Sequence, residues 1–262
     1  MANSEFEEYD VIGRPSDAVQ ENVKEKLEGL LEERKEEVFF SRQLDEVMYE
    51  DEFFHWITNR ALRELVEEGL VRSETHLLSS GGSINIISHR KYRYYKRSTR
   101  RLVKLVEEYA NPNIGAAIGL HGEMMVPERF ARSQFLMRGR NTRTFGEREW
   151  KETEHDLDFI FERDSVAYGV EVKNKLAYME HDELVTKMEV CEALNIRPVF
   201  VVRMMPKTWI NELVERGGFA LILKYQLYPW THKDLAKKVS RELGLPVDSP
   251  RALEEGGRWR GL

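Results

Sequence analysis

Residues 156–161 read DLDFIF and residues 168–173 read YGVEVK, and a short polar turn around Asp164-Ser165 joins them. Both stretches have the length of strands and are rich in β-branched and aromatic residues, so they predict a β-hairpin. Centring the hairpin on its turn brings apolar side chains opposite one another: Phe161 and Tyr168, Phe159 and Val170, Leu157 and Val172. These pairs form one apolar face, which supports the register.

The other face of this hairpin is charged. The same register places Asp158 opposite Glu171, and two facing carboxylates repel unless a positive group lies between them. A divalent cation is a suitable occupant. Lys173 lies two residues beyond Glu171 on the same face, close enough to direct an ammonium at a water or a phosphate oxygen. The alternative is a solvated face of cross-strand ion pairs that also involves Asp156 and Lys175.

The residues around the hairpin predict an α/β domain with the element order αβββαβαβ. Hydrophobic periodicity and breakers give the following ranges: a helix over 114–137 with a kink or restart at Pro127, strands over 142–150, 155–162 and 167–173, a helix over 179–194, a strand over 198–204, a helix over 207–216 and a strand over 219–228. A closing helix is expected over 231–243.

The residues before this domain predict a smaller, mostly helical one. Helices are expected over 15–37, 41–48 and from about 53 to 68, with Gly69 ending the third, and a hairpin over 71–88 turns at Ser80-Gly81-Gly82-Ser83. Three helices and a hairpin are typical of a winged helix. A further helix over 98–110 precedes the breaker Asn111-Pro112-Asn113, the expected domain boundary. The expected organisation is a flexible segment 1–14, a winged-helix domain with a basic extension 15–110, a second domain 111–245 and a tail 246–262.

Composition limits the class of protein. The chain has 262 residues with a formal net charge of −6, which argues against a uniformly basic surface for nucleic acid. Cys191 is the single cysteine, so an internal disulfide, a zinc cage and a secreted disulfide scaffold are excluded. The first fourteen residues have no apolar run. We therefore expect a cytoplasmic protein without a signal peptide, a membrane span or a membrane partner.

Paired carboxylates beside an E-x-K sequence resemble the PD-(D/E)XK, or restriction-endonuclease-like, nuclease superfamily. The resemblance covers about residues 112–228, and archaeal Holliday-junction resolvases and Mrr-type enzymes are its nearest members. It implies a restriction-endonuclease-like core, a mixed central sheet flanked by helices. The proline of the superfamily name is absent, because Leu157 precedes Asp158.

The resemblance also implies residue roles. Asp158, Glu171 and the backbone carbonyl of Val172 would hold Mg²⁺ or Mn²⁺, and Lys173 would position or help to deprotonate the attacking water. Asp156 is a substitute or second ligand. A glutamate from the preceding helix often completes such sites, and here Glu123 is the first candidate and Glu128 the second.

Two basic stretches are candidate DNA-binding segments. Residues 89–104 hold eight Lys or Arg and no acid: Arg90, Lys91, Arg93, Lys96, Arg97, Arg100, Arg101 and Lys104. Arg100 and Arg101 are expected in the first turn of a helix, and tyrosines 92, 94 and 95 are expected to stack on bases or to join the core. Residues 129–148 include Arg138 and Arg140 and are expected to line a substrate cleft. The third helix is expected to expose Thr58, Asn59, Arg60 and Arg63 to the major groove.

The sequence therefore predicts a magnesium-dependent DNA endonuclease targeted by a winged helix. Two alternatives remain open. One is a non-catalytic winged-helix DNA-binding regulator that keeps a nuclease-like fold, and the other is an RNA endonuclease. A homodimer is a further expected partner, because members of the superfamily often cut as dimers.

Overall fold

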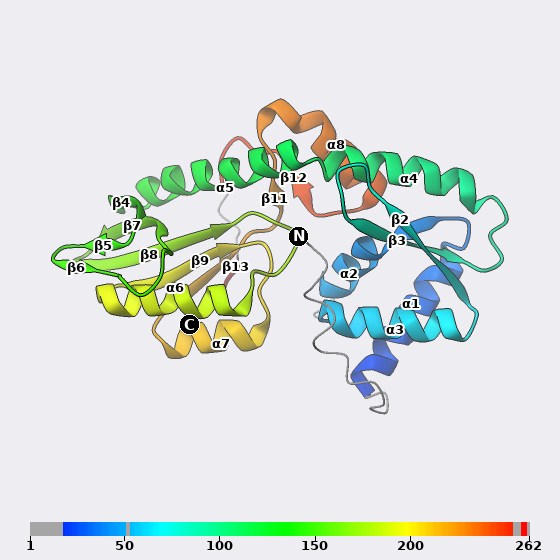
Figure 1. The fold of residues 1–262 in the computed structure, drawn as a ribbon, viewed down its shortest axis with the longest axis horizontal. Helices are drawn as coiled ribbons and strands as arrows, with labels where there is room; N and C mark the ends of the chain where they lie inside the picture. Colours follow the sequence, from blue (N-terminus) through cyan, green and yellow to red (C-terminus); the bar gives the residue numbers. More distant parts are fainter. Residues whose placement is uncertain (1–17, 51–52, 254–257, 261–262) are drawn as a thin grey trace. The chain divides into compact units, whose positions relative to one another are not determined.

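The computed structural model describes residues 18–50, 53–253 and 258–260 (Figure 1). The first segment expected from the sequence, residues 1–14, lies outside the described residues. The described part is a mixed α/β structure with eight α-helices, and none of these helices is long and apolar enough to span a membrane. It divides into two compact units. Unit 1 reaches Ile114 and includes Lys238–Leu245, and unit 2 comprises Gly115–Lys237 and the residues from Pro246 onward. The observed boundary lies within a few residues of the breaker at 111–113, but residues 238–245 were not expected in unit 1.

Unit 1 contains three helices, a hairpin and a fourth helix. The elements are α1 (Ala18–Glu33), α2 (Ser41–Glu50), α3 (His55–Glu67), β2 (Val71–Leu77), β3 (Ser83–His89) and α4 (Tyr95–Tyr109). A short strand that the sequence did not predict, β1 (Val38–Phe40), pairs antiparallel with β3. The helices form the core by burying their apolar stripes against one another, with Val23, Leu27, Leu44 and Leu65 fully buried. Gly81 and Gly82 adopt positive φ at the hairpin turn, a conformation that favours glycine.

Three expectations for unit 1 are corrected. The first helix ends at Glu33 rather than near Glu37. Thr58 is buried, so it is not part of an exposed face of α3. Helix α4 begins at Tyr95, so Lys96 and Arg97, rather than Arg100 and Arg101, occupy its first turn.

Unit 2 is built on a six-stranded mixed sheet with the order β13-β10-β9-β8-β7-β4. The strands are β4 (Leu136–Thr142), β7 (Leu157–Arg163), β8 (Val166–Lys173), β9 (Arg197–Val202), β10 (Phe219–Ile222) and β13 (Arg258–Arg260). Strands β8, β9 and β10 are parallel, and β4, β7 and β13 are antiparallel to their neighbours. The helices are α5 (Pro112–Arg132), α6 (His181–Leu194) and α7 (Lys207–Glu215). The expected order αβββαβαβ is therefore present.

Helices cover both faces of this sheet. Alternate strand residues form a cluster with α5 on one face, including Phe159, Val170 and Val201. On the other face Phe200 and Val202 pack with α6 and α7, so those helices lie opposite α5 (Figure 1). A strand covered on both faces is apolar throughout, which explains the continuous apolar run of β9.

Other expectations for unit 2 are wrong in detail. Helix α5 is continuous through Pro127. The first core strand is 136–142 rather than 142–150; β5 (Thr144–Phe145) and β6 (Arg148–Glu149) form a small hairpin turning at Gly146 with φ +61°. Strand β4 was missed because it is an edge strand with a mostly exposed, polar sequence and therefore has no alternating pattern.

The C-terminal part of the chain also differs from expectation. Strand β10 ends at Ile222, and β11 (Gln226–Leu227) pairs separately with β12 (Val247–Asp248). The closing helix α8 (Lys233–Leu243) follows a 3-10 turn, η1 (Trp230–His232). Within the expected tail, residues 258–260 form the edge strand β13.

Candidate functional site

The hairpin of β7 and β8 has the predicted register over most of its length. Its backbone pairs run from Arg163↔Val166 to Phe159↔Val170. Asp164 and Ser165, which form the turn, both have positive φ, as two-residue hairpin turns of type I′ require.

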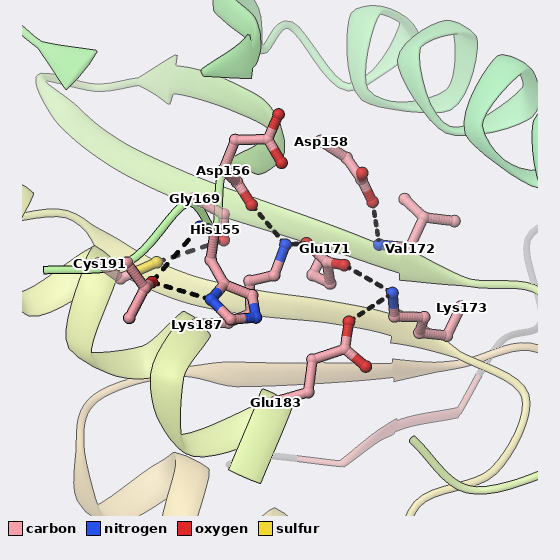
Figure 2. Close-up of polar contacts among 11 residues, drawn as sticks. His155, Asp156, Asp158, Gly169, Glu171, Val172, Lys173, Glu183, Lys187 and Cys191 are labelled. Atoms are coloured by element: carbon pink, nitrogen blue, oxygen red, sulfur yellow. Dashed lines mark hydrogen bonds and ion pairs between the residues drawn. The ribbon is translucent and has the colours of Figure 1, made fainter. Parts of the chain in front are cut away.

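The backbone pairing of the hairpin ends before Asp158. Instead of a backbone pair between Asp158 and Glu171, the Asp158 carboxylate accepts a hydrogen bond from the Val172 N–H at 2.7 Å (Figure 2). Leu157 packs with Ile160 and residues of α6, so it does not continue the apolar face opposite Val172 as predicted. The strands are therefore bridged at this point by the side chain of Asp158.

Glu171 is buried and held by two lysines. Its side chain points toward α6, where its Oε2 lies 2.7 Å from the Lys187 ammonium, and its Oε1 lies 2.9 Å from Lys173. Lys187 also donates to the backbone carbonyl of Asp156 (Figure 2). Since Glu171 and Lys187 are only 3% and 7% exposed, each compensates for the loss of the other's hydration.

Lys173 is shared between two carboxylates. Besides Glu171, it contacts Glu183 of α6 at 2.7 Å. Burial disfavours the Lys173 ammonium, but Glu171 and Glu183 outweigh burial and raise its pKa above the ordinary value. Lys173 therefore stays protonated at neutral pH. Its expected role, to position or help to deprotonate the attacking water, stays a prediction.

The surroundings of Asp158 disfavour its ionised form. Burial and then the nearby charge of Glu171 raise its pKa to about 7, although the Val172 N–H and Lys187 act in the opposite direction. Glu123 of α5 also contributes to the increase. Half of the Asp158 side chains would therefore be ionised near neutral pH, and a cation close to the carboxylate would favour the ionised form.

The two glutamates of α5 occupy different surroundings. Glu123 is half-buried and acts on Asp158, whereas Glu128 is exposed and forms an ion pair with Arg132 at 2.6 Å. Gly122 explains how α5 approaches the sheet, since a Cβ there would lie 2.6 Å from Cβ of Asn174. Asn174 donates to the Ile118 carbonyl of α5 at 2.8 Å, so the helix is fixed to the end of β8. Glu123 is thus the better candidate for completing the site.

Of the other two predicted ligands, Asp156 is placed differently, and the backbone carbonyl of Val172 stays a prediction. The Asp156 side chain is exposed, and in Figure 2 its carboxylate points away from Glu171, so only its backbone carbonyl takes part in the cluster. The Val172 side chain belongs to the apolar core, and its N–H is taken by Asp158.

Sequence reasoning missed Lys187 and Glu183. A signal for Lys187 was present, because it lies between Leu184 and Cys191 at the spacing of the apolar stripe of α6, and a lysine in such a stripe needs a buried partner. Glu183 carried no comparable signal, because an acidic residue in the first turn of a helix is ordinary.

The donor set can be compared with what a divalent cation needs. Asp158, Glu171 and Glu123 offer carboxylate oxygens, which Mg²⁺ and Mn²⁺ prefer. As they are placed in the described residues, no three such side chains converge closely enough to hold a metal ion. The lysines occupy both oxygens of Glu171 instead. The residues fit a divalent cation in their chemistry.

The first basic stretch forms an exposed cluster in unit 1. All eight of its cations are exposed: Arg90, Lys91, Arg93, Lys96, Arg97, Arg100, Arg101 and Lys104, here called the basic cluster. Within the described part of the chain, Arg101 alone among them forms an ion pair, with Glu242 at 3.0 Å. The cluster is a concentrated positive surface on an acidic protein.

The candidate DNA-binding residues of helix α3 and of the second basic stretch, residues 129–148, are less accessible than the basic cluster. Asn59 and Arg60 are half-buried, and Arg63 is exposed. The acidic residues at the end of α3 turn to α1, where Lys24 pairs with Glu64 and Glu68. In unit 2, Arg138 pairs with Glu162 at 3.1 Å, and Arg140 lies over the ring of Phe159 at 5.8 Å.

Comparison of the whole chain with protein-family models, with curated proteins and with solved structures found no match.

Proposed function

We propose that the protein is a metal-dependent endonuclease that hydrolyses DNA phosphodiester bonds in unit 2 and binds DNA through unit 1, whose helices and hairpin we interpret as a winged helix. Within this proposal unit 2 is a restriction-endonuclease-like core. The αβββαβαβ order, the mixed sheet and the E-x-K sequence of β8 support that interpretation.

One observation carries the proposal. The carboxylates of Asp158 and Glu171 lie beside the Lys173 ammonium at the end of one hairpin, and the charge of Glu171 contributes to the raised pKa of Asp158. Ion pairs with two lysines compensate for the burial of Glu171. They do not do the same for Asp158, whose pKa is raised to about 7. A group destabilised in this way is typical of a functional site.

Each residue has a role in the proposed reaction. Asp158 and Glu171 would hold Mg²⁺ or Mn²⁺, with Glu123 of α5 as a further ligand. The bound ion would supply an activated water and charge neutralisation at the phosphate. Lys173 would position the water, help to deprotonate it or stabilise the developing negative charge. Glu183 would retain Lys173 beside the site after Lys173 leaves Glu171.

The alternative is a non-catalytic DNA-binding regulator. It accounts for the basic cluster but gives no reason for Lys173 and the buried Glu171 to lie together beside Asp158.

One assay distinguishes the two functions. Wild type is incubated with Mg²⁺ or Mn²⁺ and a panel of duplex, flap, junction and single-stranded DNA. An Asp158→Asn, Glu171→Gln variant and a chelator are the controls. Metal-dependent cleavage by wild type alone supports the enzyme, and binding without cleavage under every condition supports the regulator.

A further inference from the structure

The basic cluster of unit 1 contains three tyrosines, and the structure gives them different roles. The Tyr92 hydroxyl lies 2.9 Å from Ser98 Oγ. The Tyr95 ring packs under the Arg72 guanidinium at 4.7 Å. Tyr94 is 77% exposed, and its side chain makes no hydrogen bond or ring contact within the described residues. Two of the tyrosines therefore stabilise the fold, and Tyr94 does not.

Tyr94 is held in place by its backbone. It is the N-cap residue of α4, and its carbonyl accepts a hydrogen bond from the Arg97 N–H at 3.2 Å. Helix α4 is anchored by the buried Leu102, Leu105 and Val106. The ring is thus presented to solvent from an ordered position, which reduces the entropy cost of contacting a ligand.

The positive charge around Tyr94 favours an anionic ligand. Arg93, Lys96 and Arg97 are its neighbours in sequence, all three are exposed, and none forms an ion pair with a described residue. Lys96 and Arg97 also lie in the first turn of α4, where the helix dipole disfavours cations, so a bound phosphate would relieve an existing repulsion.

We propose that the basic cluster binds a single-stranded segment of DNA, with the Tyr94 ring stacked on an unpaired base and the neighbouring cations on its phosphates. A duplex would satisfy the cations but would leave Tyr94 without a partner, because stacking between base pairs covers the base faces. An unpaired base offers a free face, and aromatic stacking on such faces is how single strands are commonly bound. This inference rests on the DNA-binding part of the proposed function and is independent of cleavage.

The test measures binding without metal, so that cleavage cannot contribute. Fluorescence anisotropy compares a labelled single strand with a blunt duplex of the same sequence, each over a series of salt concentrations. Tyr94→Ala should weaken binding of the single strand by about tenfold, as expected for loss of one stacked base, and leave the duplex within about twofold. The slope of log affinity against log salt should not change, because the phosphate contacts remain.

Two further variants make the comparison specific. Tyr94→Phe keeps the ring and removes the hydroxyl, so it should bind the single strand like wild type. Val214→Ala removes another exposed apolar side chain, 42% exposed on α7 of unit 2, and should have no effect. Circular dichroism checks that the overall helix content is retained.

Three results would overturn the inference: an unchanged single-strand affinity in Tyr94→Ala, an equal loss on duplex and single strand, or a loss in Tyr94→Phe as large as in Tyr94→Ala. If wild type binds neither DNA, both this inference and the DNA-binding part of the proposed function are wrong. Cleavage by unit 2 is measured separately, so a catalytic failure would not be mistaken for a failure here.

Discussion

Lys187 of α6 and Glu171 of β8 form a buried ion pair with 2.7 Å between Nζ and Oε2. Lys187 also donates to the Asp156 carbonyl, directly before β7, so a single ammonium contacts β8 and the residue that leads into β7. The relative positions of Asp158 and Glu171 therefore depend on a helix residue outside the E-x-K sequence.

Replacing Lys187 with Met should destabilise the protein markedly. The change keeps most of the apolar stem but leaves Glu171 buried with Lys173 as its remaining charged partner. Removing one partner of a buried pair typically costs about 3–5 kcal/mol. Urea unfolding measures the change in the free energy of unfolding. The exposed Lys175, substituted in the same way, is the control and should change stability by less than about 0.5 kcal/mol. Equal effects of the two variants would show that the pair contributes little.

Magnesium or manganese binding should require both carboxylates. Calorimetric titration of wild type should show binding, and the Asp158→Asn, Glu171→Gln variant should show none, because both proposed carboxylate ligands on the hairpin are lost. Glu128→Gln removes an exposed carboxylate that is paired with Arg132 and should bind metal as wild type does. Unchanged binding in the double variant would place any metal elsewhere in the protein.

Stability should depend on pH through Asp158. Its pKa is raised from 3.8 to about 7 in the folded state, so the folded protein binds this proton more tightly than the unfolded chain does. The resulting stabilisation is fully present below about pH 4 and is lost as pH rises through about 7. The difference in melting temperature, wild type minus Asp158→Asn, should therefore decrease as the pH is raised from about 4 to about 7. Asp45 also has a pKa raised to about 7, mainly by burial, but it is present in both proteins and cancels in the difference.

Metal binding should show the opposite pH dependence. Magnesium competes with the proton on Asp158, so its apparent affinity should be higher at about pH 8 than at about pH 5.5. Calorimetry at the two values measures this. An affinity that is equal at both would mean that Asp158 is not a ligand.

The salt dependence of DNA binding should depend on the free members of the basic cluster. Arg97→Ala and Arg100→Ala should each flatten the slope of log affinity against log salt by about one unit, the value for one lost phosphate contact. Arg101→Ala should have a smaller effect, because Arg101 is already paired with Glu242. Arg216→Ala, in unit 2 and paired with Glu212, is the control. Slopes that do not change would mean that the cluster contacts no phosphate.

Local patterns were sufficient for the part of the hairpin near its turn and for the helices and parallel strands that follow it. The register of Phe159 and Phe161 against β8 was predictable because alternation and a two-residue turn specify it together. The edge strand β4 was not, because an exposed strand needs no apolar alternation. Strand β13 was missed since it pairs with β10, more than thirty residues earlier in the chain.

The sequence pointed to the strand residues of the candidate site and to Glu123 of α5, but not to the residues that α6 contributes. Asp158, Glu171 and Lys173 could be grouped from strand spacing alone. The contacts of Lys187 and Glu183 depend on how α6 packs across the sheet, which no local pattern contains. The closeness of that packing is set partly by Gly169, where a Cβ would lie 2.5 Å from the Cys191 sulfur. The pKa of Asp158 likewise arises from burial and from charges on three different elements.

The most direct test of the catalytic assignment is a comparison of cleavage rates in Mg²⁺ between wild type and Lys173→Met, with magnesium affinity measured on the same samples. Metal holding does not require Lys173, so the variant should still bind Mg²⁺, and its DNA affinity should change little because the basic cluster remains. Cleavage should fall by about a hundredfold or more, the scale for losing a positioned electrostatic group. If wild type cuts DNA and the variant cuts it at the same rate, the assignment of Lys173 and of this hairpin to catalysis is wrong.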